Sequence, residues 1–214
     1  MGFDIALSNV IVTLLFIAPG FILCKFKKTF SEHLSSMSAI LIYFCAPCMI
    51  INSFLNLDYS PKNLANMGIF FGITLALQII FITIIYLILR RKYEDGKYRI
   101  LTIGSVLGNV GFFGLPIIRA LLPNNPEVTC YSSVYVISMN IIVFTMGVFC
   151  LTGDKKYMTI KSAILNPSTF GLVIALPLFI FGAKNFLPSV ALNSIKIVGE
   201  MTTPLCMMIL GVRL

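Results

Sequence analysis

Seven long apolar stretches dominate this 214-residue chain and limit what it can fold into. A helix needs about 20 mostly apolar residues to cross a lipid bilayer. Only 11% of the residues are charged, against roughly 25% in a soluble domain, and so few charges do not cover a surface that faces water. The sequence therefore predicts an all-α integral membrane protein with seven transmembrane helices, near residues 6–24, 34–56, 64–89, 100–122, 129–151, 168–186 and 189–211.

Lysine and arginine gather in alternate loops between these spans. Basic clusters occupy loops 25–33, 90–99 and 152–167, whereas the second loop has only Lys62 and the fourth has none. Cytoplasmic loops carry an excess of Lys and Arg. We therefore expect these three loops in the cytoplasm, the N-terminus outside, and a multi-pass protein of the cell membrane. The clustered residues are Lys25, Lys27, Lys28, Arg90, Arg91, Lys92, Lys97, Arg99, Lys155, Lys156 and Lys161.

Several classes of function have no support in the sequence. The net charge of +8 lies mainly in short loop clusters and forms no single basic face, so nucleic acid is not an expected partner. His33 is the only histidine, and a metal site needs several ligands. Neither a Walker sequence nor a G-x-S-x-G segment occurs. We therefore expect no enzyme activity, no metal and no cofactor.

Two prolines recur at a nearly constant spacing along the chain. Pro177 follows Pro19 by 158 residues, and Pro204 follows Pro47 by 157. Each pair occupies corresponding places in spans one and six, or in spans two and seven. Five spans separate the two copies, so the second copy is inverted relative to the first. Inverted repeats are typical of secondary transporters, in which the two halves exchange conformations around a central site.

The repeat predicts a division of the chain into three parts. Residues 1–151 form a first five-helix repeat, residues 152–167 a cytoplasmic connector, and residues 168–214 the start of a second repeat. Copies of spans three to five are expected after Leu214. We interpret the chain as C-terminally truncated, with helices eight to ten missing.

The segment 108–116, in the middle of span four, contains three glycines and a proline. Pro116 lacks a backbone donor and clashes with the carbonyl of Phe112. Freed backbone groups are tolerated inside a membrane only where protein or a polar cavity satisfies them. The segment therefore predicts a broken helix beside a binding cavity, in which Asn109 offers donors and an acceptor. A kinked helix that only packs closely against its neighbours is the alternative.

Other polar residues within the spans are functional candidates, because burying them in lipid is costly. Lys196 and Glu200 are four residues apart on span seven and share a face, so they form either a coupling pair or a structural pair. Arg119 lies one turn beyond the break and either faces an anionic ligand or snorkels to the interface. Asn140 and Gln78 either line the transport region or hydrogen-bond between helices.

Several segments together resemble the auxin efflux carrier (AEC) family. Asn109, Gly114 and Pro116 form N-x4-G-x-P, which is similar to the crossover segment of that family, and residues 166–170 are similar to its N-P-x-T-[FY] segment. The prolines of spans two and seven also fall where the family has them. The similarity covers essentially the whole chain.

This resemblance implies a sodium–proton-antiporter-like fold of two inverted five-helix repeats. Helices one, two, six and seven would form a scaffold, through which homodimers form, and the remaining helices a moving transport domain. The substrate, a small organic anion such as a dicarboxylate, would bind at the broken fourth helix. The residues that the resemblance and the spans assign to this site are Asn109, Gly111, Gly114, Pro116 and Asn140, with Lys196 and Glu200 as a separate charge pair.

The sequence thus predicts a secondary-active permease or efflux carrier that works by alternating access. Two alternatives stay open. Without helices eight to ten, the chain would be a non-transporting membrane fragment, scaffold or sensor. A related inverted-repeat fold, such as that of a bile-acid or sodium–proton transporter, often has acidic residues in the transport core, and spans three to five have none in their interiors.

Overall fold

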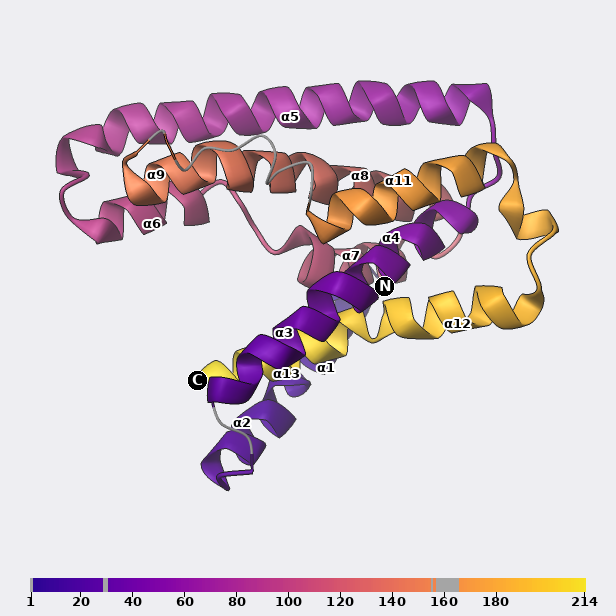
Figure 1. Ribbon diagram of the computed structural model, residues 1–214, viewed down its shortest axis with the longest axis horizontal. Helices are drawn as coiled ribbons and strands as arrows, with labels where there is room; N and C mark the ends of the chain where they lie inside the picture. Colours follow the sequence, from indigo (N-terminus) through magenta and orange to yellow (C-terminus); the bar gives the residue numbers. More distant parts are fainter. Residues whose placement is uncertain (1, 29–30, 155, 157–165) are drawn as a thin grey trace.

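The computed structural model describes residues 2–28, 31–154, 156 and 166–214, and within these ranges every regular element is helical (Figure 1). The prediction of an all-α membrane protein is confirmed. Lys155, Lys161 and most of the predicted connector 152–167 lie outside the described residues.

The described residues contain five helices long and apolar enough to cross a bilayer, at Phe3–Lys25, Leu34–Leu55, Pro61–Lys92, Pro126–Thr152 and Ser189–Arg213, and two shorter apolar helices, at Val110–Leu121 and Pro167–Ile180. These seven correspond to the expected spans. The sixth is shorter than expected because Gly182 adopts a left-handed φ of 63° and a 3-10 turn follows it.

Most spans are built from more than one helical piece. The first span is α1 (Gly2–Leu15) and α2 (Ile17–Lys25); the second, after the 3-10 turn η1 (Ser31–His33), is α3 (Leu34–Ile40), the π-helical η2 (Leu41–Cys45) and α4 (Ala46–Leu55); the third is α5 (Pro61–Leu89) with the 3-10 turn η3 (Arg90–Lys92). The fourth is α6 (Gly96–Gly104), the π-helical η4 (Val110–Gly114) and α7 (Leu115–Leu121); the fifth is α8 (Pro126–Ile142), the π-helical η5 (Val143–Gly147) and α9 (Val148–Thr152). The sixth is α11 (Pro167–Ile180) with the 3-10 turn η7 (Ala183–Asn185), and the seventh is α12 (Ser189–Glu200) and α13 (Thr202–Arg213).

Proline determines where four of these spans are interrupted. A proline inside a helix removes the hydrogen bond to the carbonyl four residues earlier and clashes with that carbonyl. In each of the four spans the helix ends, or widens to a π-helix, at that earlier residue. The four prolines, each with the residue four positions earlier, are Pro19 with Leu15, Pro47 with Tyr43, Pro116 with Phe112, and Pro204 with Glu200. Pro177 is the exception, because α11 continues through it.

Spans one, two, six and seven pack against one another. α2 lies along α13, and α4 contacts both α11 and α12. Glycines permit the closest approaches: a Cβ at Gly20 would collide with the carbonyl oxygen of Met208, and one at Gly211 with that of Ile17. Small residues let membrane helices approach in this way because the driving force between them is packing. Beyond these approaches, Phe54 on α4 makes an edge-to-face ring contact with Phe179 on α11, at 6.0 Å between centroids.

Spans three to five form a second group, in which α5 packs along α8 (Figure 1). A buried polar cluster joins these helices: Gln78 Nε2 donates to Ser138 Oγ at 3.0 Å, and Thr74 Oγ1 donates to the same oxygen at 3.3 Å. Ser138 Oγ in turn donates to the carbonyl of Tyr135 at 2.8 Å. Gln78 therefore takes the role of an interhelical hydrogen-bonding residue.

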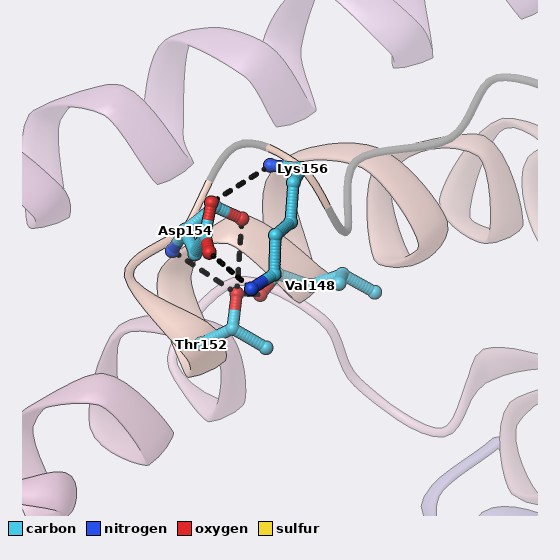
Figure 2. Close-up of polar contacts among 4 residues, drawn as sticks. All are labelled: Val148, Thr152, Asp154 and Lys156. Atoms are coloured by element: carbon cyan, nitrogen blue, oxygen red, sulfur yellow. Dashed lines mark hydrogen bonds and ion pairs between the residues drawn. The ribbon is translucent and has the colours of Figure 1, made fainter.

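The fifth span ends in a compact set of polar contacts (Figure 2). Thr152 Oγ1 donates to the carbonyl of Val148 at 2.8 Å, and Asp154 Oδ1 accepts from the backbone N–H of Lys156 at 2.9 Å. The ammonium of Lys156 lies 3.2 Å from Asp154 Oδ2. Gly153, with a φ of 73°, provides the left-handed residue that closes α9.

Candidate functional site

The fourth span is broken immediately before the glycine-rich segment. α6 ends at Gly104, and helical structure resumes only at Val110. Asn109 caps the second piece, because its Oδ1 accepts from the backbone N–H of Phe112 at 3.2 Å. The carbonyl of Asn109 also accepts from the N–H of Gly114 at 3.1 Å, the wider spacing of a π-helix. A new helix therefore starts directly after Asn109, which is its N-cap.

A cavity of about 210 Å³ lies beside this break. Asn109, Gly111 and Asn140, three of the predicted site residues, line it together. Gly111 is buried, and a Cβ there would lie 3.0 Å from Val136 Cγ2 on α8, so glycine permits close approach of the broken helix to span five. The remaining lining residues are Ile42, Ala46, Met49, Ile50, Phe112, Val136, Met139, Phe144, Asn166, Pro167 and Ser168.

Gly114 and Pro116 do not line this cavity. An added Cβ at Gly114 would contact mainly Val110, one turn earlier in its own helix, at 3.6 Å. Pro116 is the second residue of α7, the regular helix after the π-helical turn. Both residues therefore shape the break, and neither contacts the space beside Asn109.

Pro116 instead lines a second cavity, of about 440 Å³. Met49 is the one described residue that borders both cavities. The other residues of the second cavity come from spans one, two, four and seven: Asn9, Val12, Thr13, Phe16, Leu115, Arg119, Ala120, Gly199, Glu200, Thr203 and Pro204.

Glu200, one member of the predicted charge pair, borders this second cavity. Lys196 Nζ and Glu200 Oε1 are 4.0 Å apart, and both side chains are about half exposed. Arg119 is partly buried in the same cavity and interacts electrostatically with Glu200. The C-terminal end of span four therefore carries a cation that lines the same cavity as a carboxylate of span seven.

Asn166 is a cavity residue that the site prediction did not include. It caps α11, since its Oδ1 accepts from the N–H groups of Ser168 at 2.6 Å and Thr169 at 3.3 Å. Its side chain is 5% exposed, and its Nδ2 has no hydrogen-bond partner among the described residues. An asparagine directly before Pro167 is a strong signal for the start of a helix, but it does not indicate what that start faces.

The polar groups of the first cavity are mainly neutral side-chain amides and the backbone of helix ends. Among the described lining residues none carries an ionisable group, and the polar side chains are three asparagines and a serine. Two helix starts, at Asn109 and at Asn166, border it. A helix N-terminus carries about half a positive charge. The site is therefore suited to an electron-rich group without containing a lysine or arginine.

The chain is similar to a known protein family and to a known transporter. Residues 5–162 match the sequence profile of a family described as "Membrane transport protein". The chain is also 27% identical, over 221 aligned residues, to an uncharacterized transporter of Methanocaldococcus jannaschii, an alignment that covers 98% of this chain and 69% of that protein.

Proposed function

The chain belongs to the membrane transport protein family, the family of the auxin efflux carriers, and from this premise we propose that it is a secondary-active carrier of small organic anions. The observation that carries the proposal is the cavity beside the broken fourth span. Asn109, Gly111 and Asn140 meet there. Broken helices at the substrate site, with helix starts directed at anionic groups, are the arrangement by which secondary transporters bind such ligands.

Alternating access is the proposed mechanism. In it, spans three to five move against spans one, two, six and seven. The packing supports this division, because each group has its own interhelical contacts: α5 with α8 in one, and α2 with α13 and α4 with α11 in the other.

An inverted repeat is also part of the proposal. A twofold relation would exchange span one with span six and span two with span seven. The contact between spans one and seven, α2 with α13, would then correspond to the contact between spans six and two, α11 with α4. Both contacts exist. We further propose the repeat boundaries 1–151 and 168–214, homodimers through the scaffold helices, and a cell-membrane location with the N-terminus outside.

The test is transport by the purified chain in proteoliposomes. Uptake of labelled succinate and other organic anions is measured at pH 8 under an imposed ion gradient. Asn109→Leu removes the amide that lines the cavity and is expected to lower uptake at least tenfold. Asn56→Leu, at an exposed position after α4, is the matched control and should leave uptake unchanged.

Equal uptake by the wild type and Asn109→Leu would refute the site. A folded wild-type chain that moves none of these anions would instead favour the non-transporting scaffold or sensor. Separate gradients of protons, of sodium and of potential identify the coupling.

A further inference from the structure

Asn166 starts span six, and Asn109 starts the second half of span four, yet both border one cavity. Each side chain uses its oxygen in the same way. Asn109 Oδ1 accepts from one backbone N–H, and Asn166 Oδ1 accepts from two. An asparagine side chain has one oxygen and two N–H donors. Capping therefore engages the oxygen of each residue, once in Asn109 and twice in Asn166, and uses none of the N–H donors.

The N–H donors of Asn166 are the clearest case of donors that need a hydrogen-bond partner. Its Nδ2 is buried and is without a partner in the part of the chain that the structure describes. Buried donors in native proteins almost always have a partner, and an unsatisfied one needs an explanation.

We infer that Asn166 binds the substrate, and that its amide joins those of Asn109 and Asn140 in holding a single carboxylate. This inference rests on the proposed function and adds an amide of span six to the amides that spans four and five contribute to the cavity. Carboxylate oxygens accept hydrogen bonds only, which matches a lining whose capping oxygens are already engaged.

The remaining walls of the cavity identify the rest of the ligand. They are largely apolar and include Met49, Ile50, Phe112, Val136, Met139 and Phe144. A second carboxylate would lose its water against these side chains and meet no cation among the described lining residues. The ligand class is therefore a monocarboxylate with a small apolar body, in a cavity of about 210 Å³.

The two helix starts explain how a carboxylate is held without a cationic side chain. Asn109 and Asn166 each precede a helix whose positive end borders the cavity. Neutral amide donors add charge-assisted hydrogen bonds, which are about twice as strong as those between neutral groups. Because Asn166 belongs to the scaffold and Asn109 to the moving group, the ligand would bridge the two parts.

The experiment measures ligand binding to the purified, full-length chain at pH 8. The probes are hexanoate, its uncharged analogue hexanamide, and the dicarboxylate adipate. Hexanamide controls for partition of an apolar body into detergent. Asn166→Asp is the decisive variant, because Asp caps helices as well as Asn but has no N–H and repels a carboxylate. Asn185→Asp, at an exposed position in η7, is the matched control.

We expect hexanoate to bind the wild type and Asn185→Asp alike, and hexanamide and adipate to bind at least tenfold more weakly. Asn166→Asp should keep the melting temperature of the wild type and lose at least about tenfold in hexanoate affinity, which corresponds to about 1.4 kcal/mol. Asn166→Ser, which keeps a capping oxygen, serves the same purpose if Asn166→Asp does not fold.

Unchanged hexanoate binding by a folded Asn166 variant would overturn the inference and leave the carrier proposal standing. Tighter binding of adipate than of hexanoate would overturn the single-carboxylate assignment. Failure of the wild type to bind or transport any of the organic anions would overturn both proposals.

Discussion

Gly171 on α11 lies against the backbone of span two, and its substitution tests the packing of span six against span two. An ideal Cβ at this position would lie 2.9 Å from Pro47 Cα and 3.3 Å from the Pro47 carbonyl oxygen. Carbon atoms prefer separations of about 3.5–4.0 Å. Gly171→Ala therefore requires α11 to move away from α4 by roughly 0.6–1 Å, because the atoms it meets are largely backbone and do not rotate away.

Overpacking of this kind costs about 1–3 kcal/mol in free energy of unfolding. For a chain of this size each kcal/mol lowers the melting temperature by about 2–4 °C, so we expect a fall of about 2–12 °C. Gly72→Ala on α5 is the matched control, since an ideal Cβ there has no neighbour within 4 Å. Its melting temperature should stay the same or rise, because alanine favours helix over glycine by about 1 kcal/mol.

Buried thiols provide the assay. Cys45, Cys130 and Cys150 are at most 2% exposed, so a thiol-reactive fluorophore reports unfolding as these groups become accessible. Each of the two variants adds one methyl group to the wild type, so they differ only in where that group lies. Equal melting temperatures would refute the close contact of α11 with Pro47.

Three further predictions follow from other parts of the molecule. Ser138→Ala removes the acceptor of Gln78 in a buried cluster and should lower stability by about 0.6–2 kcal/mol, measured as thermal unfolding beside the wild type; no change would mean that the cluster is not formed. A membrane-impermeant thiol reagent applied to intact cells should label Lys184→Cys and not Lys92→Cys, and the opposite pattern would reverse the proposed orientation. Burial raises the pKa of Tyr93 from the ordinary phenol value of 10.0 to about 12, so the neutral phenol is favoured in the folded state. Its contribution to stability is complete below pH 10 and is lost as pH rises through 12. Tyr93→Phe should lack this component of alkaline destabilisation, and identical alkaline profiles would contradict the prediction.

Local features of the sequence explain several helix breaks, although only the break in span four was predicted. A proline perturbs the carbonyl four residues earlier, and this relation alone gives the π-helical turn before Pro116 and the end of α12 before Pro204. Pro177 shows its limit, because α11 continues without a break. Neighbouring helices determine whether freed backbone groups are satisfied, and a single segment does not reveal them.

Which residues line the first cavity is determined by contacts between segments that are far apart in the sequence. Asn109 and Asn140 line one cavity because spans four and five, which are consecutive, pack together. In the structure both α7 and the π-helical η4 contact α8. Asn166 was missed because its place at the cavity depends on how span six docks against spans two and five. Pro116 was assigned to the same space, but helical rotation turns residues a few positions apart toward different neighbours, here toward Arg119 and Glu200.

Met49 borders both cavities and sits on a backbone with little freedom. A Cβ at Gly199 would lie 3.0 Å from both the Cα and the N of Met49, so span seven presses directly on that main chain. The thioether, by contrast, is unbranched and has three rotatable bonds. The one described residue that borders both cavities therefore has a flexible side chain, and side-chain rotamers exchange far faster than domains move. We expect the tightness of this carrier against futile leakage to depend on the bulk of that one residue.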